Sequence, residues 1–181
     1  MHSTMIIYLL RHGTPIGGRL YRGNLVNDPL SEEGWTQMNS SLKNLSFDTI
    51  ATSPMKRCSE FADYISKKSK IPYSIIEDFK EIGFGDWQGK TSHQIGEEVV
   101  ERYKNDPINN PINNAENLYD FQNRVMKNYL EILDNLDQKN KLLIIAHAGV
   151  IRVIKSYILK LPIEKMFTMN IKSGSCEPFE I

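Results

Sequence analysis

The sequence has little cysteine, no excess of charge and no long apolar run, and each absence excludes a class of protein. Its two cysteines, Cys58 and Cys176, are too few for a disulfide framework and predict a reducing compartment, the cytoplasm. Because 22 Lys and Arg residues balance 22 Asp and Glu residues, the chain lacks the basic excess of a dedicated nucleic-acid-binding protein. The longest apolar run, residues 5–10, is too short to span a membrane. The MHST start carries no basic segment and no cleavage site, so we expect no signal peptide.

What the sequence does contain is an alternation of apolar runs and helical patterns. Hydrophobic residues make up 40% of the chain, enough for one core, so we predict a single domain over residues 1–181. Short, mostly apolar runs predict buried strands at residues 5–10, 47–52, 73–76 and 141–146. Apolar residues at helical spacing predict helices at residues 31–45, 92–103, 118–136 and 149–159.

Capping residues indicate where two of the helices begin. Ser31 is placed to cap the helix at residues 31–45. Ser53, followed by Pro54, is predicted to cap a further helix, since proline costs nothing at the first helical position. The apolar stripe of that helix includes Cys58, which is therefore interpreted as a core residue.

Three segments are predicted to be irregular or to lie at an edge. The glycine-rich and aromatic segment 79–89 is expected to be a loop. Residues 105–117, in which PINN occurs twice, are expected to form an irregular, mobile connection. Residues 167–181 are expected to form one or two edge strands, broken at Gly174.

Strands that are apolar on both faces and separated by helices favour an α/β fold with a mostly parallel, open sheet. Helices cover both sides of such a sheet, so we predict a single-domain, three-layer α/β/α sandwich. In open sheets of this kind, ligands bind at the carboxyl ends of the strands. The residues that follow the strands are therefore the first candidates for a functional site.

A histidine follows each of two predicted strands. The first strand leads into Arg11 and His12, and the last buried strand leads into His147 and Ala148, with a glycine after each pair. The small residues are expected to let the backbone approach a ligand closely. A helix begins behind His147, and the free amides of its N-terminus suit an anion. Arg57, in the first turn of the helix after another strand, adds a further cation.

This set of groups suits a phosphate better than a metal cation, which the arginines would repel. Histidine is a competent nucleophile toward phosphorus, and a covalent intermediate divides a difficult displacement into two easier steps. A second group must then protonate the leaving oxygen, and Glu81 is the candidate, because its neighbours Phe79, Phe84 and Trp87 favour the protonated form of a carboxyl. We therefore predict a phosphate-handling site without a metal or cofactor.

Four segments carry these residues: LLRHGTP at 9–15, SPMKR at 53–57, KEIGFGDWQG at 80–89 and AHAGVIR at 146–152. In order, spacing and strand–helix context they resemble the successive motifs of the histidine phosphatase (phosphoglycerate mutase-like) superfamily. RHG alone would mean little, but the four matches together run along nearly the whole chain. The resemblance implies a phosphoglycerate mutase-like fold and a phosphomonoesterase that acts through a phosphohistidine.

The resemblance also implies roles for individual residues. His12 would be the phosphorylated nucleophile and Glu81 the proton donor. The phosphate would be bound, and its transfer stabilised, by Arg11, Arg57, His147 and the backbone amide of Ala148. Glu116 stands where members often have a Gly-Glu-Ser sequence before the long helix.

Within the superfamily, residues 17–38 and 53–62 most resemble the α-ribazole phosphatases of cobalamin nucleotide-loop assembly. The resemblance then implies α-ribazole 5′-phosphate as the substrate. Many members have an asparagine that contacts the phosphate where this chain has Gly18. Arg22 or Asn24 is expected to take its place in substrate binding.

Two other functions remain open. A phosphoglycerate mutase would return the phosphoryl group to another hydroxyl of the substrate, but the connection between Glu81 and the long helix lacks the insertion usual in family mutases. A non-catalytic regulator that binds a phosphorylated ligand would need the arginines but neither His12 nor Glu81, and both are present. The expected partner is a small phosphomonoester, the expected assembly a monomer or homodimer, and Arg152 is interpreted as a structural helix residue.

Overall fold

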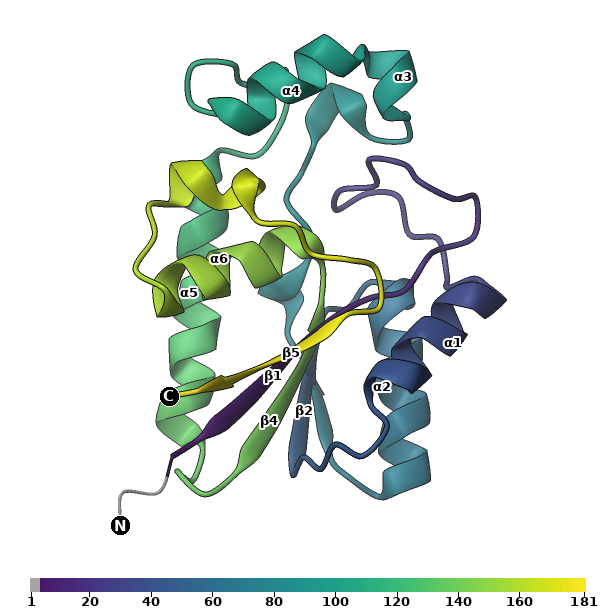
Figure 1. The fold of residues 1–181 in the computed structure, drawn as a ribbon, viewed down its shortest axis with the longest axis vertical. Coiled ribbons are helices and arrows are strands. Elements are labelled where there is room, and N and C mark those ends of the chain that lie inside the picture. Colours follow the sequence, from purple (N-terminus) through teal and green to yellow (C-terminus); the bar gives the residue numbers. More distant parts are fainter. Residues whose placement is uncertain (1–3) are drawn as a thin grey trace.

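The computed structural model describes residues 4–181, so most of the MHST start lies outside the described residues. The chain forms a five-stranded sheet in the order β3-β2-β4-β1-β5 (Figure 1). The first four strands along the chain run parallel, and β5 runs antiparallel to β1 at the edge. The strands are β1 (Ile6–Arg11), β2 (Thr49–Thr52), β3 (Tyr73–Ile75), β4 (Lys141–Ala146) and β5 (Cys176–Glu180). The predicted mostly parallel, open sheet is confirmed.

Helices cover both faces of the sheet and complete the predicted three-layer α/β/α sandwich (Figure 1). On one face lie α1 (Glu32–Ser41) and α2 (Lys56–Ser69), and on the other α5 (Leu118–Asn135) and α6 (Ala148–Ile158). The shorter α3 (Ser92–Ile95) and α4 (Glu97–Asn105) lie beyond the carboxyl ends of the strands. Short 3₁₀ helices occur at η1 (Glu77–Phe79), η2 (Gly85–Trp87) and η3 (Ile163–Thr168). Within residues 4–181, no helix is long and apolar enough to cross a membrane.

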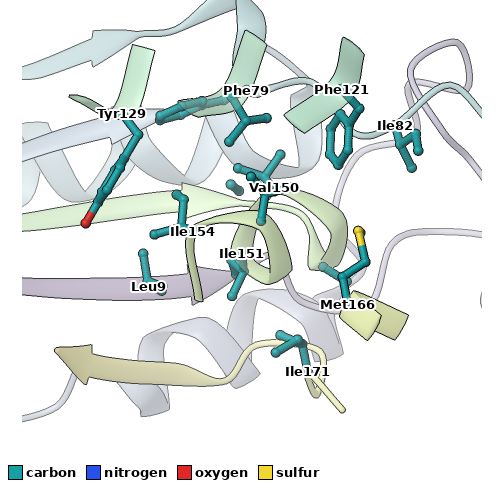
Figure 2. Close-up of a cluster of buried hydrophobic side chains, with 14 of the residues drawn as sticks. Leu9, Phe79, Ile82, Phe121, Tyr129, Val150, Ile151, Ile154, Met166 and Ile171 are labelled. Atoms are coloured by element: carbon teal, nitrogen blue, oxygen red, sulfur yellow. The ribbon is translucent and has the colours of Figure 1, made fainter. Parts of the chain in front are cut away.

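The central strands are buried on both faces because successive side chains of a strand point to opposite sides. In β1, Ile7 and Leu9 pack in the cluster formed with α5 and α6, whereas Tyr8 and Leu10 pack with α1 and α2. Figure 2 shows the first cluster, in which Leu9 and Phe121 lie among the apolar side chains of α6. Burial on both faces is the physical reason for the unbroken apolar runs in the sequence.

The helix starts were predicted correctly in one case and wrongly in the other. Ser31 caps α1 as predicted, and α1 ends at Ser41 rather than near residue 45. Ser53 does not cap α2, because Met55 occupies the cap position. The Ser53 hydroxyl lies against His147 instead, so a tertiary contact overrides the local capping pattern.

The helix predicted at residues 92–103 is divided at Gly96. The backbone φ of this residue is +103°, a value that residues other than glycine rarely adopt. The two parts are α3 and α4. Residues 105–117 are irregular, as predicted. This connection is nevertheless tied to η2, because the Asp86 amide donates a hydrogen bond of 3.1 Å to the Asn113 carbonyl oxygen.

The remaining segments follow the predictions in outline. Residues 79–89 form a loop apart from the short η1 and η2. The stretch 167–181 contains one strand, β5, which begins just after Gly174 and forms the predicted edge of the sheet. Residues before Gly174 belong to η3 and a loop rather than to a second edge strand.

Candidate active site

The strand register brings the two predicted histidines together. β1 and β4 are neighbours, and Arg11 lies opposite Ala146, so the residues that follow leave the sheet side by side. These residues are His12 and His147, and their ring centres are 5.2 Å apart. β2 pairs with the other side of β4 and ends near the same level, which places Ser53 beside His147.

His12 is buried and oriented as a nucleophile. Its Nδ1 lies 2.8 Å from the Gly13 carbonyl oxygen. A carbonyl only accepts hydrogen bonds, so Nδ1 carries the proton and Nε2 keeps its lone pair. Burial, reinforced by the charges of Arg57 and Arg11, holds the pKa of His12 well below its ordinary value. The ring is therefore neutral at neutral pH, which is the form that attacks phosphorus.

His147 is fully buried and is oriented by Ser53. The Ser53 Oγ accepts a hydrogen bond from the Met55 amide and lies 2.6 Å from the Nε2 of His147. A hydroxyl can both donate and accept, and in the tautomer in which Ser53 donates to Nε2 the proton of the neutral ring lies on Nδ1. Burial and the nearby Arg57 charge lower the pKa of His147, so this ring is also neutral. Ser53 is a functional residue that the sequence analysis treated only as a helix cap.

Arg11 and Arg57 are both hydrogen-bonded to the backbone, and each keeps at least one nitrogen without a partner among the described residues. Arg57, only 1% exposed, donates to the carbonyl oxygens of Gly23 and Val26 at 3.1 and 2.9 Å. Arg11 also donates to a backbone carbonyl, and burial lowers its pKa to about 10, so it remains charged at neutral pH. Among the described residues, the Nε of both arginines and the Nδ1 of His147 are buried without a partner. Arg11 and Arg57 line one cavity with the neutral His12, and two guanidinium groups beside a histidine suit the oxygens of a phosphate. His147 lies behind His12 and is not among the residues that line this cavity.

Glu81 lines the same cavity and is held there by two backbone amides. Its Oε1 accepts from the Ile82 amide at 2.9 Å, and its Oε2 accepts from the Gly149 amide at 3.1 Å. Gly149 lies in the first turn of α6, whose N-terminus was predicted to bind the phosphate directly. That amide is taken by Glu81 instead. Ala148, one residue earlier, does line the cavity, and its contact with phosphate stays a prediction.

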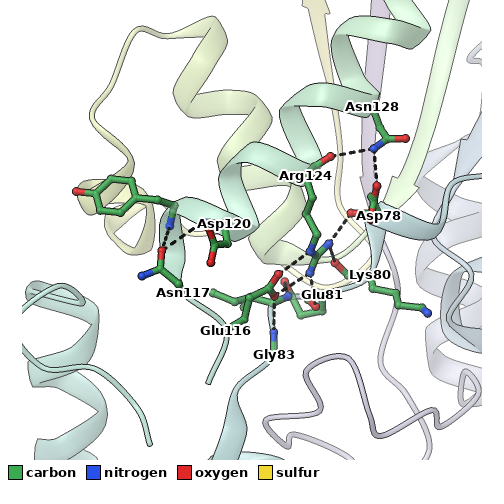
Figure 3. Close-up of polar contacts among 11 residues, drawn as sticks. Asp78, Lys80, Glu81, Gly83, Glu116, Asn117, Asp120, Arg124 and Asn128 are labelled. Carbon is green, nitrogen blue, oxygen red and sulfur yellow. Dashed lines mark hydrogen bonds and ion pairs between the residues drawn. The ribbon is translucent and has the colours of Figure 1, made fainter. Parts of the chain in front are cut away.

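A polar network around Arg124 fixes the loop that carries Glu81 (Figure 3). Arg124 of α5 donates to backbone carbonyl oxygens of residues 78, 80 and 81. It also forms an ion pair of 2.6 Å with Glu116, which in turn accepts a hydrogen bond from the Gly83 amide at 2.9 Å. The loop is therefore fastened to α5 on both sides of Glu81.

The glycines after the two histidines have a different purpose from the one predicted. A Cβ at Gly13 would lie 2.2 Å from the carbonyl oxygen of Gly34, so this glycine lets α1 pack against the loop after β1. A Cβ at Gly149 would lie 2.1 Å from Oε1 of Glu81. The prediction that these glycines admit a ligand was wrong, because elements distant in sequence fill the space.

The two expected replacements for the missing asparagine differ in position. Arg22 is buried, and both Arg22 and Gly18 line the cavity. Its guanidinium pairs with Asp28 at 2.9 Å and donates to two carbonyl oxygens of its own loop, so it fastens that loop. Asn24 is not among the residues that line the cavity, and its side chain lies against Gly83. The structure therefore does not bring Asn24 to the phosphate site as predicted.

The cavity has a volume of about 470 Å³ and includes residues that the sequence analysis did not assign to it. Arg152, interpreted as structural, lines the cavity. Its spacing of four residues from Ala148 places both on one face of α6, and this signal was available in the sequence. Tyr103 and Lys172 also line the cavity, and no local pattern marks them. Within residues 4–181, no group of three His, Cys, Asp or Glu side chains is arranged to hold a metal ion.

Comparisons with known proteins agree with this geometry. The model of the histidine phosphatase superfamily (branch 1) matches residues 7–181. The chain is 26% identical to the adenosylcobalamin/alpha-ribazole phosphatase of Escherichia coli (strain K12), over 98% of this chain and 90% of that protein. It is 31% identical to a probable phosphatase of Schizosaccharomyces pombe, over 92% of this chain and 78% of that protein.

A solved structure shows the same fold. The crystal structure of the alpha-ribazole phosphatase from Shigella flexneri superposes with a TM-score of 0.78 at 25% identity, and the match covers 96% of this chain and 89% of that one. The family match extends over almost the whole chain and contains His12, Arg57, Glu81 and His147. The chain therefore belongs to the histidine phosphatase superfamily and is a phosphatase.

Proposed function

We propose that this phosphatase hydrolyses a small phosphomonoester through a phosphohistidine on His12. One observation carries the proposal. A neutral His12 with its Nε2 lone pair free lines one cavity together with the guanidinium groups of Arg11 and Arg57. A phosphate places its oxygens on these donors and its phosphorus at Nε2.

In the first step, the Nε2 lone pair of His12 forms a bond to phosphorus while the bond from phosphorus to the ester oxygen breaks. The leaving oxygen takes a proton from the Glu81 carboxyl. Arg11 and Arg57 stabilise the charge that spreads over the transferring oxygens, and the neutral His147 donates a further hydrogen bond through Nδ1. The products of this step are the free alcohol and phospho-His12.

In the second step, water attacks the phosphohistidine. The Glu81 carboxylate accepts a proton from the water while the bond between phosphorus and Nε2 breaks, which restores His12 and releases inorganic phosphate. Glu81 thus acts first as an acid and then as a base. None of these steps uses a metal ion.

We propose α-ribazole 5′-phosphate, an intermediate of cobalamin nucleotide-loop assembly, as the first substrate to test. The E. coli and Shigella relatives are alpha-ribazole phosphatases by name, which supports this choice. The cavity offers aromatic side chains on which a flat base can pack, from Tyr21, Phe84, Tyr103 and Phe167.

The covalent intermediate can be tested by labelling. Incubation with radiolabelled substrate in excess chelator, followed by an alkaline quench, is expected to trap one acid-labile phosphate on His12. The variant His12→Ala is expected to lose both the label and turnover, whereas His93→Ala, at an exposed histidine of α3, is expected to keep both. Label on another residue, or turnover that requires an added metal, would contradict the mechanism.

The role of Glu81 can be tested separately with Glu81→Gln. Formation of phospho-His12 from an alkyl phosphate is expected to slow by about 10²–10⁴-fold, because an alkoxide needs a proton to leave. The burst with p-nitrophenyl phosphate is expected to slow far less, since its leaving group needs little protonation. Equal slowing of both bursts would assign the proton to another group. Conversion of 3-phosphoglycerate to its isomer without free phosphate would identify a mutase instead.

A further inference from the structure

The outer part of the cavity carries more positive charge than one phosphate requires. Besides Arg11, Arg22 and Arg57, the lining includes four further cations: Arg19, Lys104, Arg152 and Lys172. Glu81 is the one carboxylate among the described lining residues, and both its oxygens already accept backbone amides. The single carboxylate of Glu81 thus faces seven cations in the described lining.

Arg152 is the centre of this group. It is half-buried, its Nε donates to the Met169 carbonyl oxygen at 3.0 Å, and its guanidinium lies 5.5 Å from the centre of the Phe167 ring. Within residues 4–181, it forms no ion pair with a carboxylate. A partly desolvated guanidinium without a carboxylate in contact is costly, which favours the binding of an anion from outside.

Two other buried or half-buried arginines are paired. Arg22 has Asp28 at 2.9 Å, and Arg124 has Glu116 at 2.6 Å. Arg19 and Lys172, which are exposed at the mouth of the cavity, form no ion pair among the described residues. Lys104 already has a counterion, because its Nζ lies 3.8 Å from Oε1 of Glu101.

The outer cations lie close enough to the inner site to act on one ligand. Burial lowers the pKa of Arg11 most, the Glu81 charge raises it, and the charges of Arg152 and Arg19 lower it, so both outer arginines lie near enough to act on Arg11. Arg152 comes from α6, Arg19 from the loop after β1, and Lys172 from the segment before β5. All three side chains line the same cavity as His12.

We propose that Arg19, Arg152 and Lys172 form a second anion subsite, which binds a carboxylate or a second phosphate of the substrate while the first phosphate lies at His12. The inference rests on the proposed phosphatase function and widens its substrate class. α-Ribazole 5′-phosphate has its phosphate as its only anionic group and does not use this subsite. A phosphomonoester with a second anion gains contacts with all three cations.

Matched substrates test the subsite. Butanediol monophosphate and butanediol bisphosphate differ only in a second phosphate, and phosphooxybutanoate carries a carboxylate in the same position. At low salt, the wild-type kcat/KM is expected to be about 10-fold to 100-fold higher for a dianionic member than for the monophosphate, the effect of a charge-assisted hydrogen bond. Whichever dianionic substrate has the larger increase in kcat/KM, the bisphosphate or the carboxylate, shows which second anion the subsite prefers.

Variants assign the effect to the named residues. In Arg152→Gln, and more fully in the double variant Arg19→Gln with Arg152→Gln, the ratio of the two kcat/KM values is expected to fall toward one. Arg102→Gln removes the same charge from the exposed surface of α4, outside the cavity, and is expected to keep the ratio. A wild-type ratio near one, or a ratio that persists in the double variant, would overturn the subsite.

Failure of the phosphatase function would be visible separately. If no member of the set is hydrolysed and His12 is not labelled, the proposed function fails. Calorimetric titration of the wild type and Arg152→Gln with the same monophosphate and bisphosphate then decides the subsite. A selective loss of affinity for the bisphosphate in the variant supports it, and equal affinities of the wild type for both compounds contradict it.

Discussion

The contact between Gly149 and Glu81 offers a sharp test of how the general acid is held. The Gly149 amide donates to Oε2 of Glu81 at 3.1 Å, and a Cβ on Gly149 would lie 2.1 Å from Oε1 and 3.2 Å from Cζ of Phe121. Phe121 is fully buried and cannot give way easily, whereas a carboxyl can swing. In Gly149→Ala, the Glu81 carboxyl is therefore expected to leave its position.

The expected magnitudes follow from these contacts. Gly149 is helical with an ordinary φ, so alanine favours the helix by about 1 kcal/mol. Loss of the hydrogen bond to the carboxylate costs about 1.5–3 kcal/mol, which leaves a net destabilisation of about 0.5–2 kcal/mol. Displacement of the acid is expected to slow phospho-His12 formation from an alkyl phosphate by about 10²-fold or more, with far less effect on p-nitrophenyl phosphate.

Rapid-quench measurement of the phosphohistidine burst, together with urea unfolding, separates these effects. Ser156→Ala is the control, because Ser156 lies on the same helix and its buried hydroxyl has no partner among the described residues. This variant is expected to keep both bursts. If Gly149→Ala folds and its burst with the alkyl phosphate is unchanged, the position of Glu81 does not matter and the reasoning is refuted.

Three further outcomes are expected. Arg57→Ala should lower kcat/KM by about 10-fold to 100-fold, and Arg57→Lys should recover only part of it, because an ammonium cannot reproduce the fixed geometry of the guanidinium; unchanged kinetics would place Arg57 outside the site. Arg124→Gln should slow the burst with an alkyl phosphate more than that with p-nitrophenyl phosphate, whereas Lys155→Gln, which breaks a surface ion pair of the same 2.6 Å length, should change neither. The free energy of unfolding should fall as the pH drops below about 6.5, by up to about 1.4 kcal/mol per pH unit for each of two histidines, His12 and His147. The reason is that burial lowers their folded-state pKa, so the unfolded chain binds more protons than the folded one. Urea unfolding at several pH values would show this slope, and His12→Asn should reduce it; a slope that is the same in both proteins would contradict the assignment.

The sequence by itself was sufficient for the strands, the fold class and the main members of the site. The apolar runs that became β1 and β4 are buried on both faces, and such runs identify central strands without any knowledge of their partners. Once the sheet is parallel, the residues after its strands must meet at one edge, and this rule brought together Arg11, His12 and His147. Local patterns were enough for these conclusions because a strand buried on both faces must be apolar throughout, and because the geometry of a parallel sheet is the same whatever its sequence.

Only the tertiary structure decided which partner each small or polar residue would have. Ser53 has the pattern of a helix cap, but it binds His147, which is 94 residues away in the sequence. Gly13 and Gly149 have the pattern of ligand-binding glycines, but they make room for Gly34 and for the Glu81 carboxyl. A hydroxyl or a missing side chain has several uses of similar energy. The choice among them depends on which distant element packs alongside, and local sequence does not contain that information.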